Sequence, residues 1–350
     1  MSEQKYSGAA FAGCDFVVRL EENRRGTPIR LLQLTDMQFI DAAQMRTPDR
    51  LRVDEVQAWG TDKRMAMCGN QIVSLVTQTK PDLIFITGDI VYGEFDDSGN
   101  SFEWFCDFMD GFGIPWAPVF GNHDNETARG VDWQCARFAQ SRHCLFARGE
   151  VTGNGNYTVG IAVGDELVRV MHMVDSHGCL HAGGIYPDQL DLIAQNAAAY
   201  GDVPGFMAFH IPTECFAQAE KAKGYIADAH VDYTIGVDVA AKDGDFGACY
   251  ERYGVLKTDR DFMAFLHDNR IDGVFVGHCH RINTCITYEG VKLVFGLKTG
   301  QYDYHQAGSL GGTLVTLGGD GFDVQHVPAL VPLAPMPSGA PFLRDLLVKI

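Results

Sequence analysis

The chain has 350 residues, of which 46% are hydrophobic and 21% charged, as is typical of a globular protein with one large domain or two ordinary ones. Its net charge of −17 argues against binding to nucleic acid, because contact with the phosphate backbone needs a basic surface. No apolar run reaches the length of a membrane span, and residues 1–12 lack the basic and apolar segments of a signal peptide. We therefore expect a cytoplasmic protein whose ten scattered cysteines stay reduced.

Strands and helices are predicted to alternate in the first third of the chain. They follow an N-terminal preamble, residues 1–27, that contains an edge strand at 16–20. In order, we predict a strand, a helix, a strand, a helix and a strand at residues 29–34, 64–79, 83–87, 101–112 and 115–120. This alternation favours parallel βαβ units.

The rest of the chain is predicted to contain hairpins as well as helices. We predict helical segments at residues 126–146, 187–200 and 259–269, and strands at 206–209 and 274–276. We predict hairpins at 156–174, 284–295 and 312–327. Periodicity is weak at 213–258, so we expect an insertion or lid there. If the hairpins form a second sheet on the βαβ sheet, the fold is α/β, a two-sheet sandwich flanked by helices. We expect one domain at 28–335 and a tail at 336–350.

Polar side chains directly follow five of the predicted strands. In open α/β sheets that end of a strand is where ligands bind. Carboxylate, amide oxygen and imidazole together suit divalent Mn, Fe, Zn or Co. Seven ligands are too many for one such ion and suit two ions bridged by a carboxylate. The seven candidates are Asp36, Gln38, Asp89, Asn122, His210, His278 and His280.

Two further residues of the Gly-Asn-His-Asp stretch are candidates for catalysis. His123 is an uncoordinated imidazole beside the ligand Asn122, where it can protonate a leaving group. We expect Asp124 to orient that imidazole.

The order of these motifs resembles the calcineurin-like metallophosphoesterase superfamily, whose pattern is D-x-H, G-D-x-x-D, G-N-H-D/E, a later H, and G-H-x-H. This sequence reads D-M-Q, G-D-I-V-Y, G-N-H-D, H-I-P and G-H-C-H between residues 36 and 280. Residues 208–212 and 296–305 further resemble the purple-acid-phosphatase-like subgroup. The resemblance implies a four-layer αββα fold. It implies that metal one takes Asp36, Gln38, Asp89 and His280. Metal two takes Asp89, Asn122, His210 and His278, with Asp89 bridging.

Two positions depart from the family pattern. Gln38 stands where His is usual, and a neutral oxygen ligand favours Mn over Zn. The Asp-x-Gln variant is similar to that of Mn-dependent ADP-ribose and CDP-alcohol diphosphatases. Tyr92 stands where many relatives have Asp and where true purple acid phosphatases have a Tyr ligand to iron. We favour Gln38 as the ligand, with Tyr92 packed nearby or facing the cleft.

The other histidines have less support. Three follow a predicted strand near residues 175–176, and for each a surface or satisfied core role is favoured; we place His177 at the rim of the pocket, with His172 and His181 the other two. His305, together with Tyr302 and Tyr304, is a candidate to line the substrate cleft. Four more have no supporting context, namely His143, His230, His267 and His326.

The leading hypothesis is a dinuclear metal hydrolase. It would cleave a phosphoester of a small substrate, with a metal-bound hydroxide as nucleophile and His123 as general acid. Phosphomonoesterase, phosphodiesterase and Mn-dependent nucleotide pyrophosphatase activities stay open. The opposing classes are a non-catalytic scaffold, which should have lost several ligands, and a metal sensor, which would not need His123. We expect two divalent ions (Mn, Fe or Zn, with Mn favoured), and neither nucleic acid nor a membrane as partner.

Overall fold

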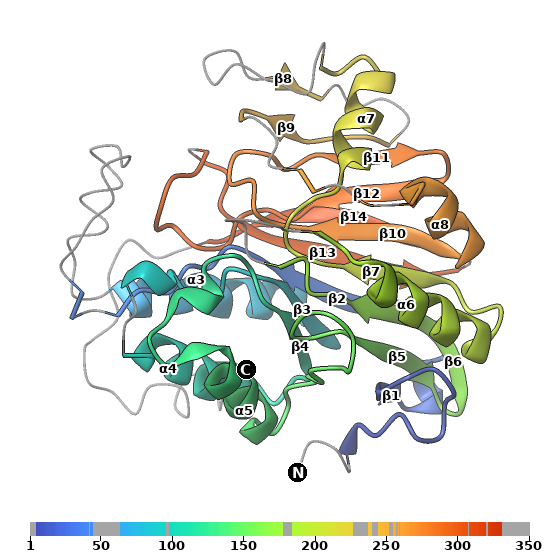
Figure 1. The fold of residues 1–350 in the computed structure, drawn as a ribbon, viewed down its shortest axis with the longest axis horizontal. Helices are drawn as coiled ribbons and strands as arrows, with labels where there is room; N and C mark the ends of the chain where they lie inside the picture. Colours follow the sequence, from blue (N-terminus) through green and yellow to red (C-terminus); the bar gives the residue numbers. More distant parts are fainter. Residues whose placement is uncertain are drawn as a thin grey trace.

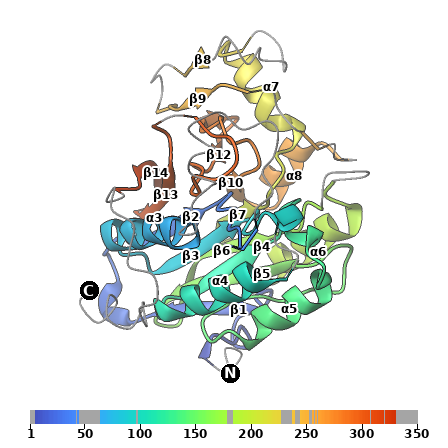
Figure 2. The same ribbon diagram turned by 90° about the vertical axis from the view of Figure 1, so that its left-hand side faces the viewer.

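Two β-sheets pack face to face, and helices cover their outer faces (Figure 1, and at right angles Figure 2). The computed structural model describes residues 5–330 except 42, 45–63, 96–97, 178–183, 227–236, 240–243, 252–254, 257, 259, 307 and 320. The expected α/β class, with two sheets flanked by helices, is confirmed. None of the helices in the described part of the chain is long and apolar enough to cross a membrane.

The first sheet has five strands in the order β14-β13-β2-β3-β4. Its parallel part is β2, β3 and β4 (Ile29–Leu34, Leu83–Thr87 and Trp116–Val119). The hairpin of β13 and β14 (Gly311–Gly318 and Gly321–Pro328) adds to β2 in antiparallel orientation. The apolar stripes of the helices on this side pack onto the strands; these helices are α3, α4 and α5 (Arg64–Thr79, Asn100–Gly111 and Gly130–Gln140).

The second sheet has seven strands in the order β1-β5-β6-β7-β10-β12-β11. In the same order, these strands span Phe16–Leu20, Tyr157–Val163, Glu166–Met173, Gly205–Ala208, Ile271–Val276, Val291–Phe295 and Cys285–Tyr288. Four neighbours, β6, β7, β10 and β12, run parallel, while hairpin partners are antiparallel. Its outer face is covered by α6, α7 and α8 (Pro187–Tyr200, Glu214–Ala222 and Phe262–Asp268), and a short ribbon of β8 and β9 (Val237–Asp238 and Ala248–Cys249) lies beyond α7.

Aromatic rings join the two sheets. Phe85 of the first sheet meets Phe275 of the second edge to face, with ring centroids 5.3 Å apart. Phe206 packs on the same ring at 5.1 Å, and all three side chains are fully buried. Because these contacts hold the sheets in one register, they also fix how the ends of the strands meet.

Most of the predicted elements are confirmed, including the edge strand at 16–20, but two expectations are wrong. The hairpin 312–327 completes the first sheet and does not join the second, because β13 pairs with β2. Residues 214–222 are not a loose lid but the helix α7, whose Phe216 packs on Phe295 in the core with ring centroids 4.9 Å apart. The domain bounds stay predictions, and the tail 336–350 lies outside the described residues.

We predict that Phe275→Ala lowers the free energy of unfolding by about 3–5 kcal/mol, because it removes a fully buried ring between the sheets and leaves a cavity. Urea unfolding followed by circular dichroism measures this loss. The control is Leu330→Ala. The Leu330 side chain is 68% exposed, so this change should alter the free energy of unfolding by no more than about 0.5 kcal/mol. Equal effects of the two changes would contradict the role of the inter-sheet rings.

Candidate metal centre

The ends of five strands, β2, β3 and β4 of the first sheet and β7 and β10 of the second, meet at one edge of the sandwich. Hydrogen bonds tie the two sheets together there. The Gln33 amide donates to the carbonyl of Val276 at 3.0 Å, and Nδ1 of His210 donates to the carbonyl of Thr87 at 2.7 Å. The turns after these strands carry all seven candidate ligands that the sequence predicts. Residues from both sheets are therefore required to build the site.

Four of the candidate ligands have a left-handed backbone. The φ angles are 49° at Asp36, 48° at Gln38, 50° at Asp89 and 72° at His278. Side-chain-bearing residues adopt this conformation at a cost, and it persists where the surrounding structure enforces it, often at functional sites. Here the left-handed conformation turns the backbone sharply at the end of each strand and directs the side chain into the space between the sheets.

Glycines let the turns approach closely. A Cβ atom at Gly121 would lie 2.1 Å from Oδ1 of Asp89, and one at Gly88 would lie 2.7 Å from Nδ1 of His210. Gly88 also has a φ of 89°. Larger residues at either position would push the carboxylate and the imidazole apart.

Four donor atoms gather in the half of the site nearest His210. Its Nε2 lies 3.4 Å from Oδ1 of Asp89 and 3.1 Å from Oδ1 of Asn122. The Asn122 oxygen lies 2.8 Å from Nδ1 of His278. Because the His210 Nδ1–H is committed to Thr87, Nε2 is the nitrogen that faces the carboxylate and amide oxygens. Oxygen and nitrogen donors at such spacing fit a divalent ion.

The other half of the site lies between Asp36 and His280. Oδ1 of Asp36 is 3.3 Å from Nε2 of His280, whose Nδ1 donates to the carbonyl of Tyr304 at 2.9 Å. Gln38 is present, but its nitrogen Nε2 lies 3.4 Å from the same imidazole nitrogen. Its oxygen Oε1 accepts a hydrogen bond from Lys298 at 2.6 Å.

A group of three fully buried residues has the spacing of metal ligands. Asp36, Asp89 and His210 each offer one atom, and these atoms lie within 4.8 Å of one another. This group spans both halves of the site, since Asp36 and Asp89 follow neighbouring strands and His210 follows a strand of the facing sheet. The residues present thus fit at least one divalent ion.

Burial and charge shift the pKa values at the site. Burial raises the pKa of the Asp36 carboxyl, but His280 and His210 outweigh it and bring the pKa to about 2. Burial lowers the pKa of His210, but Asp89 and Asp36 raise it to about 9 overall. Burial, aided by His210, lowers the pKa of His278 to about 3. A ligand must be deprotonated to bind a metal, so a proton and a metal compete for Nε2 of His210.

His123 sits beside these ligands and is held by a residue that the sequence reading missed. Its backbone N–H donates to Oδ1 of Asp89 at 2.9 Å, and its Nδ1 lies 2.9 Å from Oε2 of Glu126. The ring of Tyr92 stacks on the imidazole, with centroids 4.4 Å apart and planes 19° apart. The His123 side chain is 18% exposed, so it can be reached from solvent.

The expectation that Asp124 orients His123 is wrong. The Asp124 carboxylate is fully buried and accepts from the backbone N–H groups of Val91 at 3.0 Å and Gly121 at 2.6 Å. It shapes the turn, because it joins the ends of two strands. The residue that contacts the imidazole is two positions further along, at Glu126, and the spacing of the motif alone does not reveal it.

The segment at 296–305 brings two more charged residues to the site. Lys298 and Asp303 are 2% and 1% exposed. Oδ2 of Asp303 lies 3.8 Å from Nδ1 of His280. The sequence singles out this segment by its resemblance at 296–305, but within it the candidates are Tyr302, Tyr304 and His305 instead. Of these, Tyr302 is 1% exposed and Tyr304 packs on His280 with centroids 4.3 Å apart.

The histidines and cysteines considered next make structural contacts. His172 is a satisfied core residue, as favoured, with Thr158 and Tyr200 as hydrogen-bond partners at 3.0 and 2.9 Å, and burial lowers its pKa to about 3. Nδ1 of His177 donates to the Gly184 carbonyl at 2.9 Å. His181 and His230 lie outside the described residues. None of the nine described cysteines forms a disulfide within the described part of the chain, and eight of them are buried.

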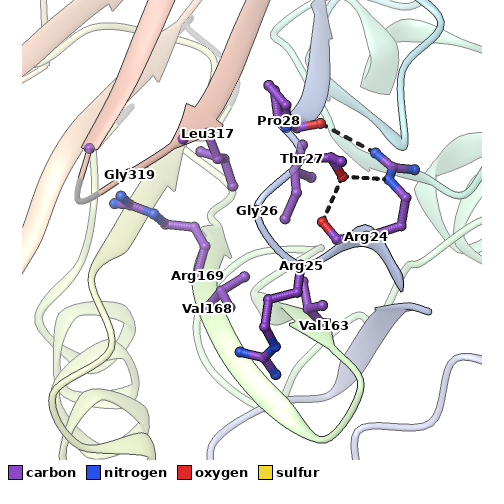
Figure 3. Close-up of a pocket in the computed structure, with 13 residues that line it drawn as sticks. Arg24, Arg25, Gly26, Thr27, Pro28, Val163, Val168, Arg169, Leu317 and Gly319 are labelled. Atoms are coloured by element: carbon purple, nitrogen blue, oxygen red, sulfur yellow. Dashed lines mark hydrogen bonds between the residues drawn. The ribbon is translucent and has the colours of Figure 1, made fainter. Parts of the chain in front are cut away.

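A cavity of about 450 Å³ lies at the opposite end of β2, far from the metal ligands (Figure 3). Three arginines line it, and each already pairs with carboxylates. Arg24 pairs with Asp82 at 2.8 Å, Arg25 pairs with Glu22 and Glu166, and Arg169 pairs with Asp272 at 2.5 Å. These carboxylates neutralise the guanidinium groups, so the cavity offers a phosphate little attraction.

Comparison with known proteins agrees with this geometry. A family model described as calcineurin-like phosphoesterase matches residues 29–281. The chain is 22% identical over 299 residues to "probable inactive purple acid phosphatase 29" of Arabidopsis thaliana, covering 81% of this chain and 74% of the relative. It is 24% identical over 318 residues to "probable inactive purple acid phosphatase 28" of the same plant, covering 80% and 71%.

Among solved structures, a purple acid phosphatase from seeds of yellow lupin (Lupinus luteus) aligns with a TM-score of 0.49 at 12% identity, covering 86% of this chain and 52% of that one. The family model spans most of the chain and includes every motif from the Asp36 turn to the His280 turn. The chain belongs to the calcineurin-like phosphoesterase family.

Proposed function

We propose that this protein is a dinuclear metal-dependent phosphoesterase. The observation that carries the proposal is the meeting of five strand ends from two sheets, which places Nε2 of His210 3.4 Å from Oδ1 of Asp89 and 3.1 Å from Oδ1 of Asn122. Divalent ions bound there would activate a water molecule and neutralise the phosphoryl oxygens. Mixed oxygen and nitrogen donors without thiolate support Mn, Fe or Zn, and we favour Mn.

In this proposal Asp89 is shared by both ions. One ion would be held with Asn122, His210 and His278, the other with Asp36 and His280. Asp89 is 1% exposed, and its Oδ1 lies 3.4 Å from Nε2 of His210 and accepts from the backbone N–H of His123 at 2.9 Å. A buried carboxylate in this position can serve two cations, since it has two oxygens and several lone pairs.

His123 is proposed to give a proton to the leaving-group oxygen. Glu126 holds its Nδ1, which leaves Nε2 as the atom that carries the transferred proton. The backbone N–H to Asp89 and the stacked ring of Tyr92 fix the plane of the imidazole. Glu126 is itself fixed, because it accepts from the backbone N–H of Glu94 at 3.0 Å.

The substrate is proposed to be a small phosphorylated molecule. The net charge of −17 would repel long polyanions, while bound divalent ions reverse the local field at the site. Monoester, diester and pyrophosphate substrates, the last of the ADP-ribose or CDP-alcohol type, all offer the phosphoryl oxygens that such ions bind. Turnover of p-nitrophenyl phosphate, its bis-ester and ADP-ribose with added Mn²⁺ distinguishes the three.

The second candidate is a non-catalytic scaffold. It is favoured by the names of the two Arabidopsis relatives, which call those proteins probable inactive. The pairing of His123 with Glu126 supports the enzyme, because a scaffold has no need of a positioned proton donor. No turnover of the three substrates at any Mn²⁺ concentration would favour the scaffold.

We predict that Asp89→Asn abolishes hydrolysis and lowers the metal content of both sites, because the neutral amide cannot bridge two cations. Metal analysis of the purified protein after dialysis measures the content. A variant that kept two ions and normal turnover would contradict the bridging role.

We predict that His123→Ala lowers kcat by roughly two to four orders of magnitude, the range expected for a general acid, while metal content stays close to that of the wild type. The loss should shrink for substrates with good leaving groups, which need less protonation. Steady-state kinetics with a series of substituted phenyl phosphates measures this dependence. An equal loss for all leaving groups, accompanied by loss of metal, would make His123 a ligand instead.

We predict that Glu126→Gln lowers kcat about tenfold, because a neutral amide still orients Nδ1 of His123 but no longer stabilises its charge. The leaving-group dependence should change in the same direction as in His123→Ala. The matched control is Glu150→Gln, an exposed glutamate away from the site, which should leave kcat unchanged. If both variants had the same kcat, the positioning role of Glu126 would be rejected.

A further inference from the structure

A buried lysine lies against metal site one. Lys298 is 2% exposed, and its segment runs beside the turn that carries Asp36. The backbone N–H of Thr299 donates to the carbonyl of Thr35 at 2.9 Å, and the carbonyl of Lys298 accepts from Gly311 at 2.8 Å. These two hydrogen bonds hold the peptide unit that joins Lys298 to Thr299, and so fix the backbone from which the side chain extends.

The Lys298 ammonium determines which way the Gln38 amide faces. Nζ donates to the backbone carbonyl of Asp36 at 2.8 Å and to Oε1 of Gln38 at 2.6 Å. Lysine only donates, so the amide oxygen must point at Nζ. The amide nitrogen then points the other way, 3.4 Å from Nε2 of His280. An amide nitrogen has no available lone pair, so the atom directed toward the ligands cannot bind a metal.

We propose that the ammonium group of Lys298 is part of site one and that Gln38 is its acceptor rather than a metal ligand. The inference rests on the metal centre of the proposed function. Site one is then left with Asp36, Asp89 and His280, and binds its ion more weakly than site two. At low metal concentration the centre holds one divalent ion and one ammonium group.

The charges around Lys298 agree with this role. Burial lowers the pKa of Lys298, and the carboxylates of Asp36, Asp89 and Asp303, each 1% exposed, oppose this shift by stabilising the ammonium form. A divalent ion at site one would be attracted by the same carboxylates and repelled by the ammonium. A unit charge a few ångströms from a divalent ion weakens binding by roughly tenfold or more at the effective dielectric constant of a protein.

The test is a titration of the metal-free protein with Mn²⁺, monitored by calorimetry and by electron paramagnetic resonance. For the wild type we expect two binding steps whose Kd values differ at least tenfold. One equivalent should give the signal of isolated Mn²⁺, and the coupled signal of a pair should appear only as the weaker step fills. Two steps of equal affinity would overturn the inference.

Two variants of Lys298 sharpen the test. Lys298→Met keeps the length of the side chain without its charge, and Lys298→Gln keeps a donor without the charge. Both should tighten the weaker step about tenfold and leave the stronger step unchanged. The matched control is Lys221→Met, an exposed lysine on α7, which should change neither step. A weaker step that loosens in both Lys298 variants would show that the lysine holds Gln38 as a ligand, and would overturn the inference.

Gln38→Leu tests the amide directly. If Gln38 only accepts from Lys298, the two Kd values should change less than about threefold, whereas a lost ligand would weaken one step by far more. Hydrolysis is assayed on the same samples at saturating Mn²⁺. Two unequal steps without any turnover would support the inference about Lys298 while rejecting the proposed hydrolase, so the two failures can be told apart.

Discussion

The structure depends on the burial of two carboxylates, Asp36 and Asp89, where the two sheets meet. Each is 1% exposed, and an uncompensated buried charge costs several kcal/mol. Compensation comes from imidazoles of the facing sheet, His280 at 3.3 Å from Asp36 and His210 at 3.4 Å from Asp89, and from backbone N–H groups. The strand ends must therefore meet closely. A cation in the gap between them lowers the remaining cost, which is why a metal centre and a buried ammonium are compatible with the same fold.

The need for the strand ends to meet closely explains several other features of the structure. Left-handed backbone at Asp36 and Asp89 costs energy locally, yet it directs both carboxylates into the gap. The rings of Phe85 and Phe275 hold the sheets at the distance that the imidazoles need. The carboxylate of Asp124, which accepts from two backbone N–H groups, fixes the turn before His123. The packing of the rings between the sheets offsets the backbone strain at the strand ends. The candidate ligands are therefore held rigidly.

The sequence predicts the strands well because their apolar runs end in polar residues, and the same pattern locates the seven candidate ligands. It does not predict partners made by tertiary contact. Glu126 reaches His123 through a 3₁₀ turn (Asp124–Glu126) that no periodicity reveals. Lys298 lies in a segment joining two strands, where lysine is usually exposed. The sequence pattern predicts the wrong sheet for the last hairpin, because a local pattern indicates which segments are strands but not which strands pair.

The pairing of that hairpin with β2 has a consequence for how the protein is made. Leu31 pairs with Val315, so β2 meets this neighbour only after all of the elements between the two strands have been synthesised. Until then one edge of β2 and its apolar residues are open to pairing with other chains. Such a high contact order favours slow folding. The nascent chain should depend on chaperones, and its metal ligands cannot be fully assembled until the turn that carries His280 has been synthesised.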